Sequence, residues 1–248
     1  MRNFLTIVAF ILTLASIADA QKRRTTTVRS AEIGQTAMVM DESISVLRSR
    51  PSLYAEPAQR MRMGRKVKIM GVTEADGVKF YRVTAMPPAS GWIQADAVFG
   101  KFRPADEERF ARLVHAANGF DQIEAAVHFF NTYPTSQFRA PLLLLFGDLV
   151  EDLAVKLARD AGNRLSRRMM AASGAPLHSY YLSYVGLDRY RKLGVTFLFN
   201  PVTRRYHYDG AAWREAVAKY PNTNEAAEAR KRLDSLKEKM NVNAAATP

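Results

Sequence analysis

The sequence predicts an α+β protein of two domains, a small β-barrel at 36–100 followed by an all-α region at 101–240. Two observations predict this fold class. The first half consists of short β-rich runs separated by turn residues, and apolar residues alternate within them, as in the run from 66 to 72. Beyond Phe102 the apolar residues recur at helical spacing, as in the run from 110 to 117.

Residues 1–20 have the features of a secretory signal peptide. Arg2 precedes an apolar run from 4 to 15, and the small residue Ala20 ends the segment. The run is shorter than the ~20 residues that a membrane-spanning helix needs, and an uncleaved anchor is the alternative. We therefore expect cleavage after Ala20, a flexible basic linker at 21–35, and a periplasmic or secreted mature chain without a transmembrane segment.

The chain carries a net charge of +12 and contains no cysteine. The charge favours anionic material of the cell envelope as a partner, such as wall polymers, lipid headgroups or acidic proteins, and nucleic acid is not expected in that compartment. Solubility alone is the alternative explanation of the charge. Without cysteine there is no disulfide bond and no thiolate zinc site, so stability depends on packing.

Five short strands are expected in the barrel, with turns between them. One of the turns is Asp76-Gly77, which separates the third strand from the fourth. Strands of this length and spacing favour a small closed or half-closed barrel. The strands are expected at 36–40, 44–47, 66–72, 80–84 and 91–93.

Four segments of this half resemble the bacterial SH3 domain. In order they read ISVLRSRPS, MRMGRKVKIMG, FYRV and SGWIQADAV. Arg50 and Phe80 depart from the family, which commonly has Gly and often has Trp at these two positions. A glycine takes positive φ at little cost and an arginine does not, so the family's turn geometry is not assumed at Arg50. The resemblance is carried by Arg48, Ser49, Pro51, Ser52, Gly64, Val67, Ile69, Tyr81, Val83, Gly91, Trp92 and Ile93.

The resemblance implies a binding or targeting module for peptidoglycan or wall-associated proteins, in a family that is rarely catalytic. The aromatic candidates for stacking on a sugar or peptide are Tyr54, Tyr81 and Trp92. Arg48 and Arg50 are the candidates for binding carboxylates, because the planar guanidinium fork suits a carboxylate better than an ammonium does. The alternative is that the rings pack the barrel and the arginines are only solvated.

The helical region opens with two expected helices that lie antiparallel. The first is expected at 104–117 and the second at 121–133. Pro134 then prevents the second helix from continuing. Ser136 is the expected N-cap of a third helix, which continues to about 162.

The joint Tyr-Pro-x-Ser/Thr occurs twice, as YPTSQF at 133–138 and YPNTNE at 220–225. With their flanks, AAVHFFNTYPTSQFRAPLLLLFGDL and AAWREAVAKYPNTNEAAEARKRL, both copies resemble the tetratricopeptide-like repeats of bacterial envelope assembly factors. The resemblance implies stacked helix pairs that present a concave surface to a protein partner. The copies are not separated by a multiple of the usual ~34 residues, so the array is degenerate or interrupted. An ordinary helical bundle with two similar corners is the alternative.

Three elements are expected between the two joints. They are a basic helix at 164–172, a tyrosine-rich helix at 177–193 and a hairpin that turns at Asn200-Pro201. Tyrosines occupy both faces of the tyrosine-rich helix, so some must be exposed or hydrogen-bonded. The small, polar tail at 241–248 is expected to be disordered.

The sequence contains no recognised pattern of a catalytic, cofactor-binding or metal site. Glu124 and His128 are one helical turn apart but have no further ligand, and HExxH, GxSxG, phosphate-loop and dinucleotide patterns are missing. The acidic cluster at 148–152 is expected to be balanced by Lys156 and Arg159 on the same helix. No catalytic residue, cofactor or metal is therefore expected.

These observations predict an exported, non-catalytic adaptor or scaffold. Its barrel would bind peptidoglycan, another anionic envelope component or a peptide, and its helices would bind an envelope protein. The alternative is a cell-wall-modifying hydrolase, or the targeting subunit of one, which a pair of carboxylates in one cleft would favour. A third interpretation treats the barrel as a structural lid on the helices, which an extensive apolar interface would favour.

Overall fold

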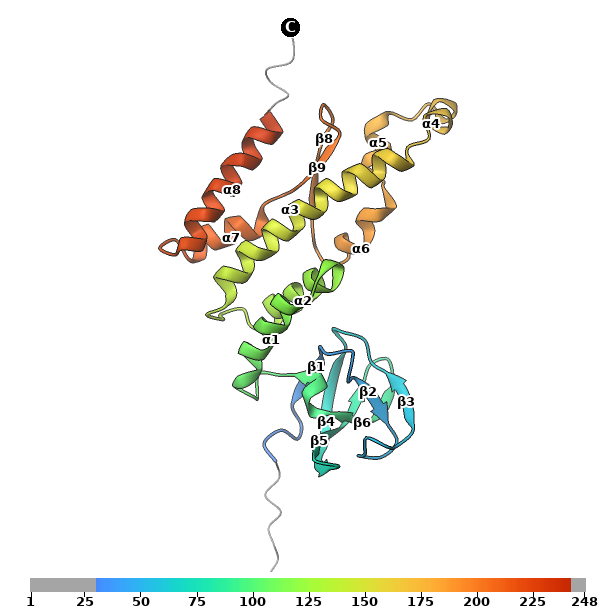
Figure 1. The fold of residues 1–248 in the computed structure, drawn as a ribbon, viewed down its shortest axis with the longest axis vertical. Coiled ribbons are helices and arrows are strands. Elements are labelled where there is room, and N and C mark those ends of the chain that lie inside the picture. Colours follow the sequence, from blue (N-terminus) through green and yellow to red (C-terminus); the bar gives the residue numbers. More distant parts are fainter. Residues whose placement is uncertain (1–29, 242–248) are drawn as a thin grey trace, which may run out of the picture. The chain divides into compact units, whose positions relative to one another are not determined.

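The computed structural model describes residues 30–241 (Figure 1). The expected signal peptide, most of the expected linker and all but the first residue of the expected tail lie outside these residues. The described chain has a mixed α+β fold, in which a curled antiparallel sheet precedes several helices and a small hairpin. Among the described residues, no helix combines the length and the apolar character of a membrane span.

The sheet has seven strands in the order β3-β2-β6-β5-β4-β1-β7, and every neighbouring pair is antiparallel. All five expected strands are present. β3 and β7 were not expected, because the residues of β3 are all exposed and show no alternation, and β7 is too short for a pattern. The strands are β1 (Thr36–Val39), β2 (Val46–Arg48), β3 (Pro57–Arg60), β4 (Lys66–Ala75), β5 (Val78–Ala85), β6 (Ala89–Gln94) and β7 (Val98–Phe99).

β4 and β5 form a long hairpin whose alternation sets the inner face of the sheet. Val67 and Ile69 of β4 and Tyr81 and Val83 of β5 are buried in the core that the sheet encloses. The turn Asp76-Gly77 is confirmed, with φ values of 53° and 72° at its two residues. Positive φ at both central residues is what a tight hairpin turn of this kind requires, and Asp and Gly tolerate it.

The helical half consists of eight α-helices, a short 3-10 turn and the hairpin β8–β9 in the described chain. The expected first, second and third helices and the expected hairpin are all present. The elements are α1 (Ala105–Ala116), α2 (Gly119–Thr132), α3 (Arg139–Arg164), α4 (Arg167–Ser173), α5 (Leu177–Leu182), α6 (Asp188–Arg191), β8 (Phe197–Asn200), β9 (Arg205–Tyr208), α7 (Ala211–Lys219) and α8 (Asn224–Asn241).

The expectation of one tyrosine-rich helix at 177–193 is wrong. The segment forms α5, then a 3-10 turn at Val185–Leu187, then α6. Tyr181, Tyr184 and Tyr190 are all buried, although a straight helix would place them on more than one face. The bend therefore turns tyrosines from different faces toward the same core.

Both Tyr-Pro-x-Ser/Thr joints have the same backbone hydrogen bonds. The amide of the tyrosine donates to the carbonyl four residues earlier, at 2.8 Å for Tyr133 and 3.0 Å for Tyr220. The amide of Ser136 or Thr223 then donates to the carbonyl of that tyrosine, at 3.3 and 3.1 Å. Because proline has no N–H, the helix ends at the tyrosine and the chain turns. The two joints are therefore repeats of one local structure.

The side chains at the two joints differ. Thr223 Oγ1 accepts a hydrogen bond from the amide of Ala226 at 3.2 Å, as an N-cap does. Ser136 Oγ accepts from the amide of Phe138 at 3.0 Å, before α3 begins, so the expectation that Ser136 caps α3 is wrong. Pro141 lies in the first turn of α3, where its missing N–H would have had no intrahelical partner.

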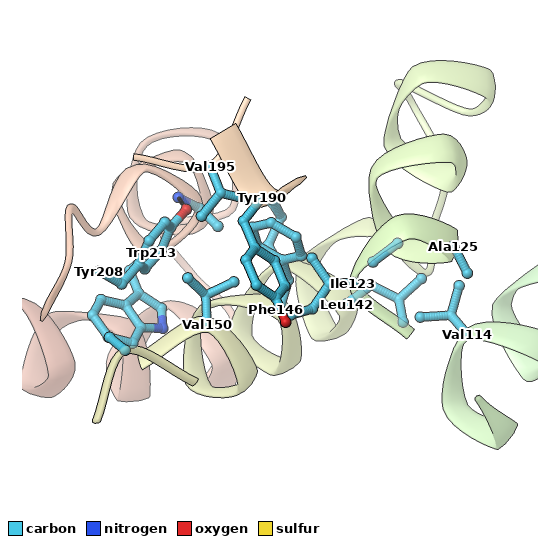
Figure 2. Close-up of a cluster of buried hydrophobic side chains, with 14 of the residues drawn as sticks. Val114, Ile123, Ala125, Leu142, Phe146, Val150, Tyr190, Val195, Tyr208 and Trp213 are labelled. Carbon is cyan, nitrogen blue, oxygen red and sulfur yellow. Dashed lines mark hydrogen bonds between the residues drawn. The ribbon is translucent and has the colours of Figure 1, made fainter. Parts of the chain in front are cut away.

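Helix α3 is central to the helical half and contacts α7, α8 and β9. Phe146 and Val150 of α3 lie beside Tyr208 and Trp213 in the core (Figure 2). Gly147 makes room for the indole, since a Cβ atom on this residue would lie 2.2 Å from Nε1 of Trp213. A larger residue at this position of α3 would push the helices apart.

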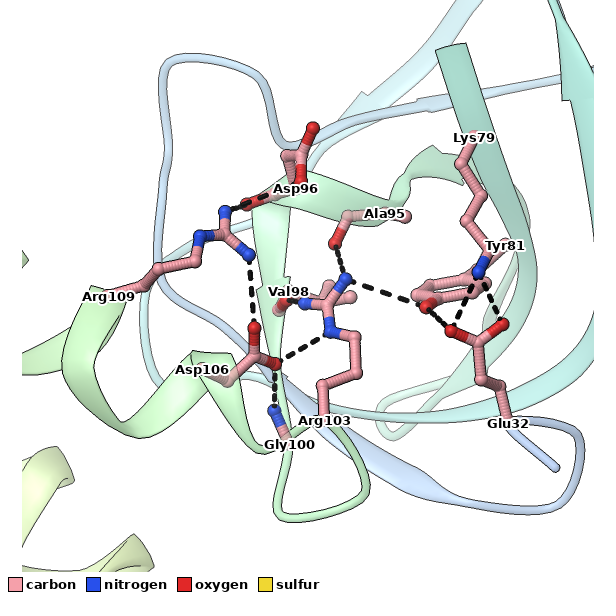
Figure 3. Close-up of polar contacts among 10 residues, drawn as sticks. All are labelled: Glu32, Lys79, Tyr81, Ala95, Asp96, Val98, Gly100, Arg103, Asp106 and Arg109. Atoms are coloured by element: carbon pink, nitrogen blue, oxygen red, sulfur yellow. Dashed lines mark hydrogen bonds and ion pairs between the residues drawn. The ribbon is translucent and has the colours of Figure 1, made fainter.

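The sheet and the helices meet through an apolar contact and a polar network. Phe99 of β7 belongs to the core of the helical half, and its ring lies 5.5 Å from that of Phe110. Figure 3 shows the polar network, in which the buried carboxylate of Asp106 accepts from Arg103 Nε at 2.8 Å and from Arg109 Nη1 at 3.0 Å. Arg103 also donates to two carbonyl oxygens of the segment 95–98. We call Arg103, Asp106 and Arg109 the junction network.

Candidate functional site

Three side chains form a row across the outer face of the sheet. Arg48 of β2 is opposite Trp92 of β6, and Trp92 is opposite Arg82 of β5. Residues directly opposite each other on antiparallel strands lie on the same face. The row lies on the outer face, because the chain neighbours of its members, such as Leu47 and Ile93, are buried in the core of the sheet. We call Arg48, Trp92 and Arg82 the Arg–Trp row.

Gly71 keeps one end of the row open. It is opposite Arg82 in β4, and a Cβ atom on Gly71 would lie 4.0 Å from Cη2 of Trp92. The indole thus reaches toward a position that has no side chain. Arg82 is exposed, and its side chain forms no hydrogen bond or ion pair with another described residue. An aromatic ring and an unpaired guanidinium therefore face solvent side by side.

Arg48 positions the neighbouring loop as well as extending the row. Its Nη1 donates to the carbonyl of Ala55 at 2.5 Å. Its Nε is buried and has no hydrogen-bond partner. The Nη1 atom of Arg48 thus stabilises the loop after β2.

The loop after β2 carries two of the predicted residues. Ser52 Oγ donates to Asp76 Oδ2 at 2.6 Å, and the amide of Leu53 donates to the same oxygen at 2.8 Å. These two hydrogen bonds, with that from Ser52 the larger influence, lower the pKa of Asp76. Tyr54 is 88% exposed on this fixed loop. Arg50 is also exposed and has no positive φ, so it does not need the backbone conformation that favours glycine.

Tyr81 is placed differently from the other predicted residues. Its side chain is buried, and its hydroxyl donates to Glu32 Oε1 at 2.7 Å. Burial and this hydrogen bond raise the pKa of the phenol far above its ordinary value. The ring of Tyr81 therefore has no exposed face on which a ligand could stack, and packing is its role.

The predicted residues are thus only partly brought together. Arg48 and Trp92 lie in one row, while Arg50 and Tyr54 lie on the adjacent loop. Arg82 was not among the predicted residues, although the FYRV segment contains the signal for it. Its neighbours Tyr81 and Val83 alternate with it, so Arg82 had to point outward if they pointed inward.

A second candidate cleft lies between the sheet and α2 and is lined by carboxylates. Burial, with Asp121 and Glu42 nearby, raises the pKa of Glu124. His128 Nε2 lies 3.9 Å from Glu124, and burial lowers the pKa of this imidazole. Within residues 30–241, no three acidic or histidine side chains converge closely enough to hold a metal ion. The cleft is lined by Met40, Asp41, Glu42, Met63, Leu113, Ala117, Asn118, Asp121 and Glu124.

Comparisons of the chain with protein-family models, with curated proteins and with solved structures find no match. The two sites are therefore assigned from their geometry and chemistry alone.

Proposed function

We propose that the protein is an exported, non-catalytic adaptor. In this proposal the sheet is an SH3-like barrel that binds peptidoglycan or a wall peptide, and the helices are a tetratricopeptide-like domain that binds an envelope protein. The observation that carries the proposal is the Arg–Trp row, in which Trp92 stands between Arg48 and Arg82 on an outer face.

The chemistry of the row suits a ligand that is both ring-shaped and anionic. The indole of Trp92 offers a flat apolar surface, and the guanidinium of Arg82 offers paired donors to a carboxylate. Peptidoglycan carries sugar rings next to peptides that bear carboxylates. The exposed ring of Tyr54 on the adjacent loop supplies a second aromatic surface for a longer ligand.

The repeated joints support the second half of the proposal. The joints at Tyr133 and Tyr220 share their backbone hydrogen bonds, and each connects two helices that pack on each other. Helix pairs of this kind serve as protein-binding scaffolds when they are stacked. A chain that binds the wall at one end and a protein at the other makes the second contact intramolecular, which raises its effective concentration.

Co-sedimentation with purified peptidoglycan sacculi tests the proposal. We expect the mature protein to sediment at low and at high salt, and we expect Trp92→Ala and Arg82→Gln to lose most of this binding while they remain folded by circular dichroism. Arg62→Gln is the matched control, because Arg62 is also an exposed arginine of the sheet half but lies outside the row. Equal binding by Arg82→Gln and Arg62→Gln, or binding that salt abolishes completely, would count against the row.

The carboxylate-lined cleft is the observation that favours the alternative, a cell-wall-modifying hydrolase. A carboxyl group with a raised pKa, such as that of Glu124, can serve as a general acid. The alternative predicts that the protein releases soluble fragments from sacculi and that Glu124→Gln stops the release. The adaptor proposal predicts that neither the wild type nor Glu124→Gln releases fragments, and that both sediment equally with the sacculi.

A further inference from the structure

The acids of α3 do not pair with the cations that were expected to balance them. Asp148 accepts a hydrogen bond from Arg232 of α8 at 3.1 Å, and Glu151 accepts from Lys239 of α8 at 2.8 Å. The expectation that Lys156 and Arg159 balance this cluster is therefore wrong. The acids face α8, and Arg159 has to be explained otherwise.

Arg159 faces a small pocket against the turn of the hairpin β8–β9. The pocket has a volume of about 240 Å³. It contains three arginines, Arg159, Arg204 and Arg205, and no acidic residue lines it. None of the three side chains forms a hydrogen bond or an ion pair with any other residue of the described chain. The pocket, which we call the hairpin pocket, is lined by Val155, Ala158, Arg159, Thr203, Arg204 and Arg205.

Three like charges that converge without a counter-charge repel one another. Each would gain from an anion, and the free chain supplies none among its described residues. The gathering of three arginines around one pocket without an acidic neighbour is the observation that points to an anionic ligand. The junction network provides the contrast, because there each arginine is paired with Asp106.

The hairpin turn is held in place by its own hydrogen bonds. The side-chain oxygen of Asn200 accepts from the amides of Val202 and Thr203, at 3.0 and 3.2 Å. The amide group of Asn200 donates to the carbonyl of Lys239 at 2.8 Å, which fixes the turn to α8. At the other end of β9, His207 Nδ1 lies 2.9 Å from Glu151 of α3. The arginines of the turn are thus presented by a fixed backbone.

We propose that the hairpin pocket binds a phosphate group, and that the group is the headgroup phosphate of an anionic phospholipid. A phosphate has enough oxygens to accept from three guanidinium forks, whereas a single carboxylate has two oxygens and one charge. Exposed apolar side chains flank the arginines, with Val155 39% exposed and Val202 56% exposed. A soluble phosphate would leave these side chains in water, whereas the boundary between the headgroups and the acyl chains of a membrane would cover them. The hairpin turn is then a peripheral membrane contact.

This site is separate from the Arg–Trp row, so the two proposals can fail independently. We would measure binding to vesicles of phosphatidylcholine with and without phosphatidylglycerol for the wild type and for the double variant Arg159→Gln/Arg204→Gln. The control variant Arg112→Gln/Arg230→Gln removes the same charge from α1 and α8, outside the pocket. Inorganic phosphate and acetate are titrated by calorimetry as soluble probes, and thermal unfolding checks that each variant is folded.

We expect binding to vesicles that contain phosphatidylglycerol, weakened about 30-fold in the pocket variant and much less in the control. We also expect inorganic phosphate to bind more tightly than acetate. Binding of inorganic phosphate that the pocket variant loses, without binding to either vesicle, would keep the phosphate site and overturn its lipid source. Equal losses in both variants, or no binding of phosphate or vesicles, would overturn the site.

Discussion

The guanidinium groups of the junction network are paired with a carboxylate, whereas those of the hairpin pocket have no partner in the described chain. Arg103 donates to Asp106 and to the carbonyl oxygens of Ala95 and Val98 (Figure 3). Arg159 donates to no described residue, and the other two arginines of its pocket are equally unpaired. The first set is therefore explained by the fold, and the second set is not.

The difference follows from burial. A guanidinium that is removed from water must be paired and hydrogen-bonded, or the protein loses stability. The exposed arginines of the pocket are hydrated and have no such need, so a fold-based reason for their convergence is missing. Arginines whose N–H donors are paired within the chain stabilise the fold, whereas arginines with unpaired donors are available to bind a ligand. We therefore expect substitutions at the junction network to change stability greatly and substitutions at the hairpin pocket to change it little.

The largest effect is expected from Asp106→Asn. The carboxylate is 1% exposed and accepts from Arg103, Arg109 and the amide of Gly100. Its loss leaves two guanidinium groups without their buried counter-charge, which costs about 3–5 kcal/mol of the free energy of unfolding. Urea unfolding followed by circular dichroism measures this cost.

The matched control is Glu108→Gln, in the same first turn of α1. Glu108 pairs with Arg112, and both side chains are exposed, so the free energy of unfolding should fall by less than about 1 kcal/mol. If the two substitutions cost the same, the junction network does not hold the sheet to α1 and the comparison fails.

The pH dependence of stability measures what a half-buried, paired carboxylate contributes to the fold. Burial would raise the pKa of Glu151, but hydrogen bonds from His207, Lys239 and the amide of Tyr208 lower it to about 2, from an ordinary 4.5. A depressed folded-state pKa stabilises the fold above the unfolded-state pKa, and this contribution is lost as the pH falls from about 4.5 to about 2. We expect a loss of up to about 3 kcal/mol in the wild type over this range.

Glu151→Gln should lack this part of the acid-dependent loss, since the amide does not titrate. Urea unfolding at about pH 6, 4.5 and 3 measures the free energy of unfolding of both proteins across this range. Parallel stability curves for Glu151→Gln and the wild type would show that Glu151 is not the group whose pKa is depressed.

A substitution that fills the space between α3 and Trp213 should have an intermediate effect on stability. A Cβ atom on Gly147 would lie 2.2 Å from Trp213 Nε1, so Gly147→Ala should cost about 1–3 kcal/mol of the free energy of unfolding. Gly162→Ala is the control on the same helix, because its Cβ would meet Tyr181 at an ordinary 3.6 Å. That substitution should be neutral or stabilise by up to about 1 kcal/mol. Thermal unfolding of the two variants would contradict this packing if the order were reversed.

The smallest effect is expected at the hairpin pocket. Arg159→Gln and Arg204→Gln should each change the free energy of unfolding by less than about 0.5 kcal/mol, because the side chains are exposed and unpaired in the described chain. A clear loss of stability in either variant would place these arginines with the structural ones and remove the reason to seek a ligand.

Local patterns predicted the elements of the fold well. The alternation around Ile69 indicated β4, Asp76-Gly77 indicated its turn, and both Tyr-Pro-x-Ser/Thr joints connect helices as expected. These features depend on the chemistry of a few adjacent residues. β3 was missed because its pairing with β2, and not a pattern of its own, makes it a strand.

Long-range partners could not be predicted in the same way. Asp148 was assigned to a cation on its own helix, whereas Arg232 is 84 residues away in sequence. Tyr81 and Trp92 looked alike as aromatic candidates, but only the strand register places one inside and one outside. Arg82, by contrast, follows from its alternation with Tyr81 and Val83. Which of several similar side chains faces a ligand is thus decided by register and packing.

Trp92 can report directly on whether the Arg–Trp row binds wall material. The chain has two tryptophans, and Trp213 is buried with an Nε1 that has no hydrogen-bond partner, so Trp213→Phe removes the second fluorophore without breaking a hydrogen bond. We would titrate this variant with disaccharide-peptide fragments of peptidoglycan and follow its fluorescence. We expect a saturable change in Trp92 fluorescence that Arg82→Gln abolishes. No change in Trp92 fluorescence, with both variants folded, would contradict it.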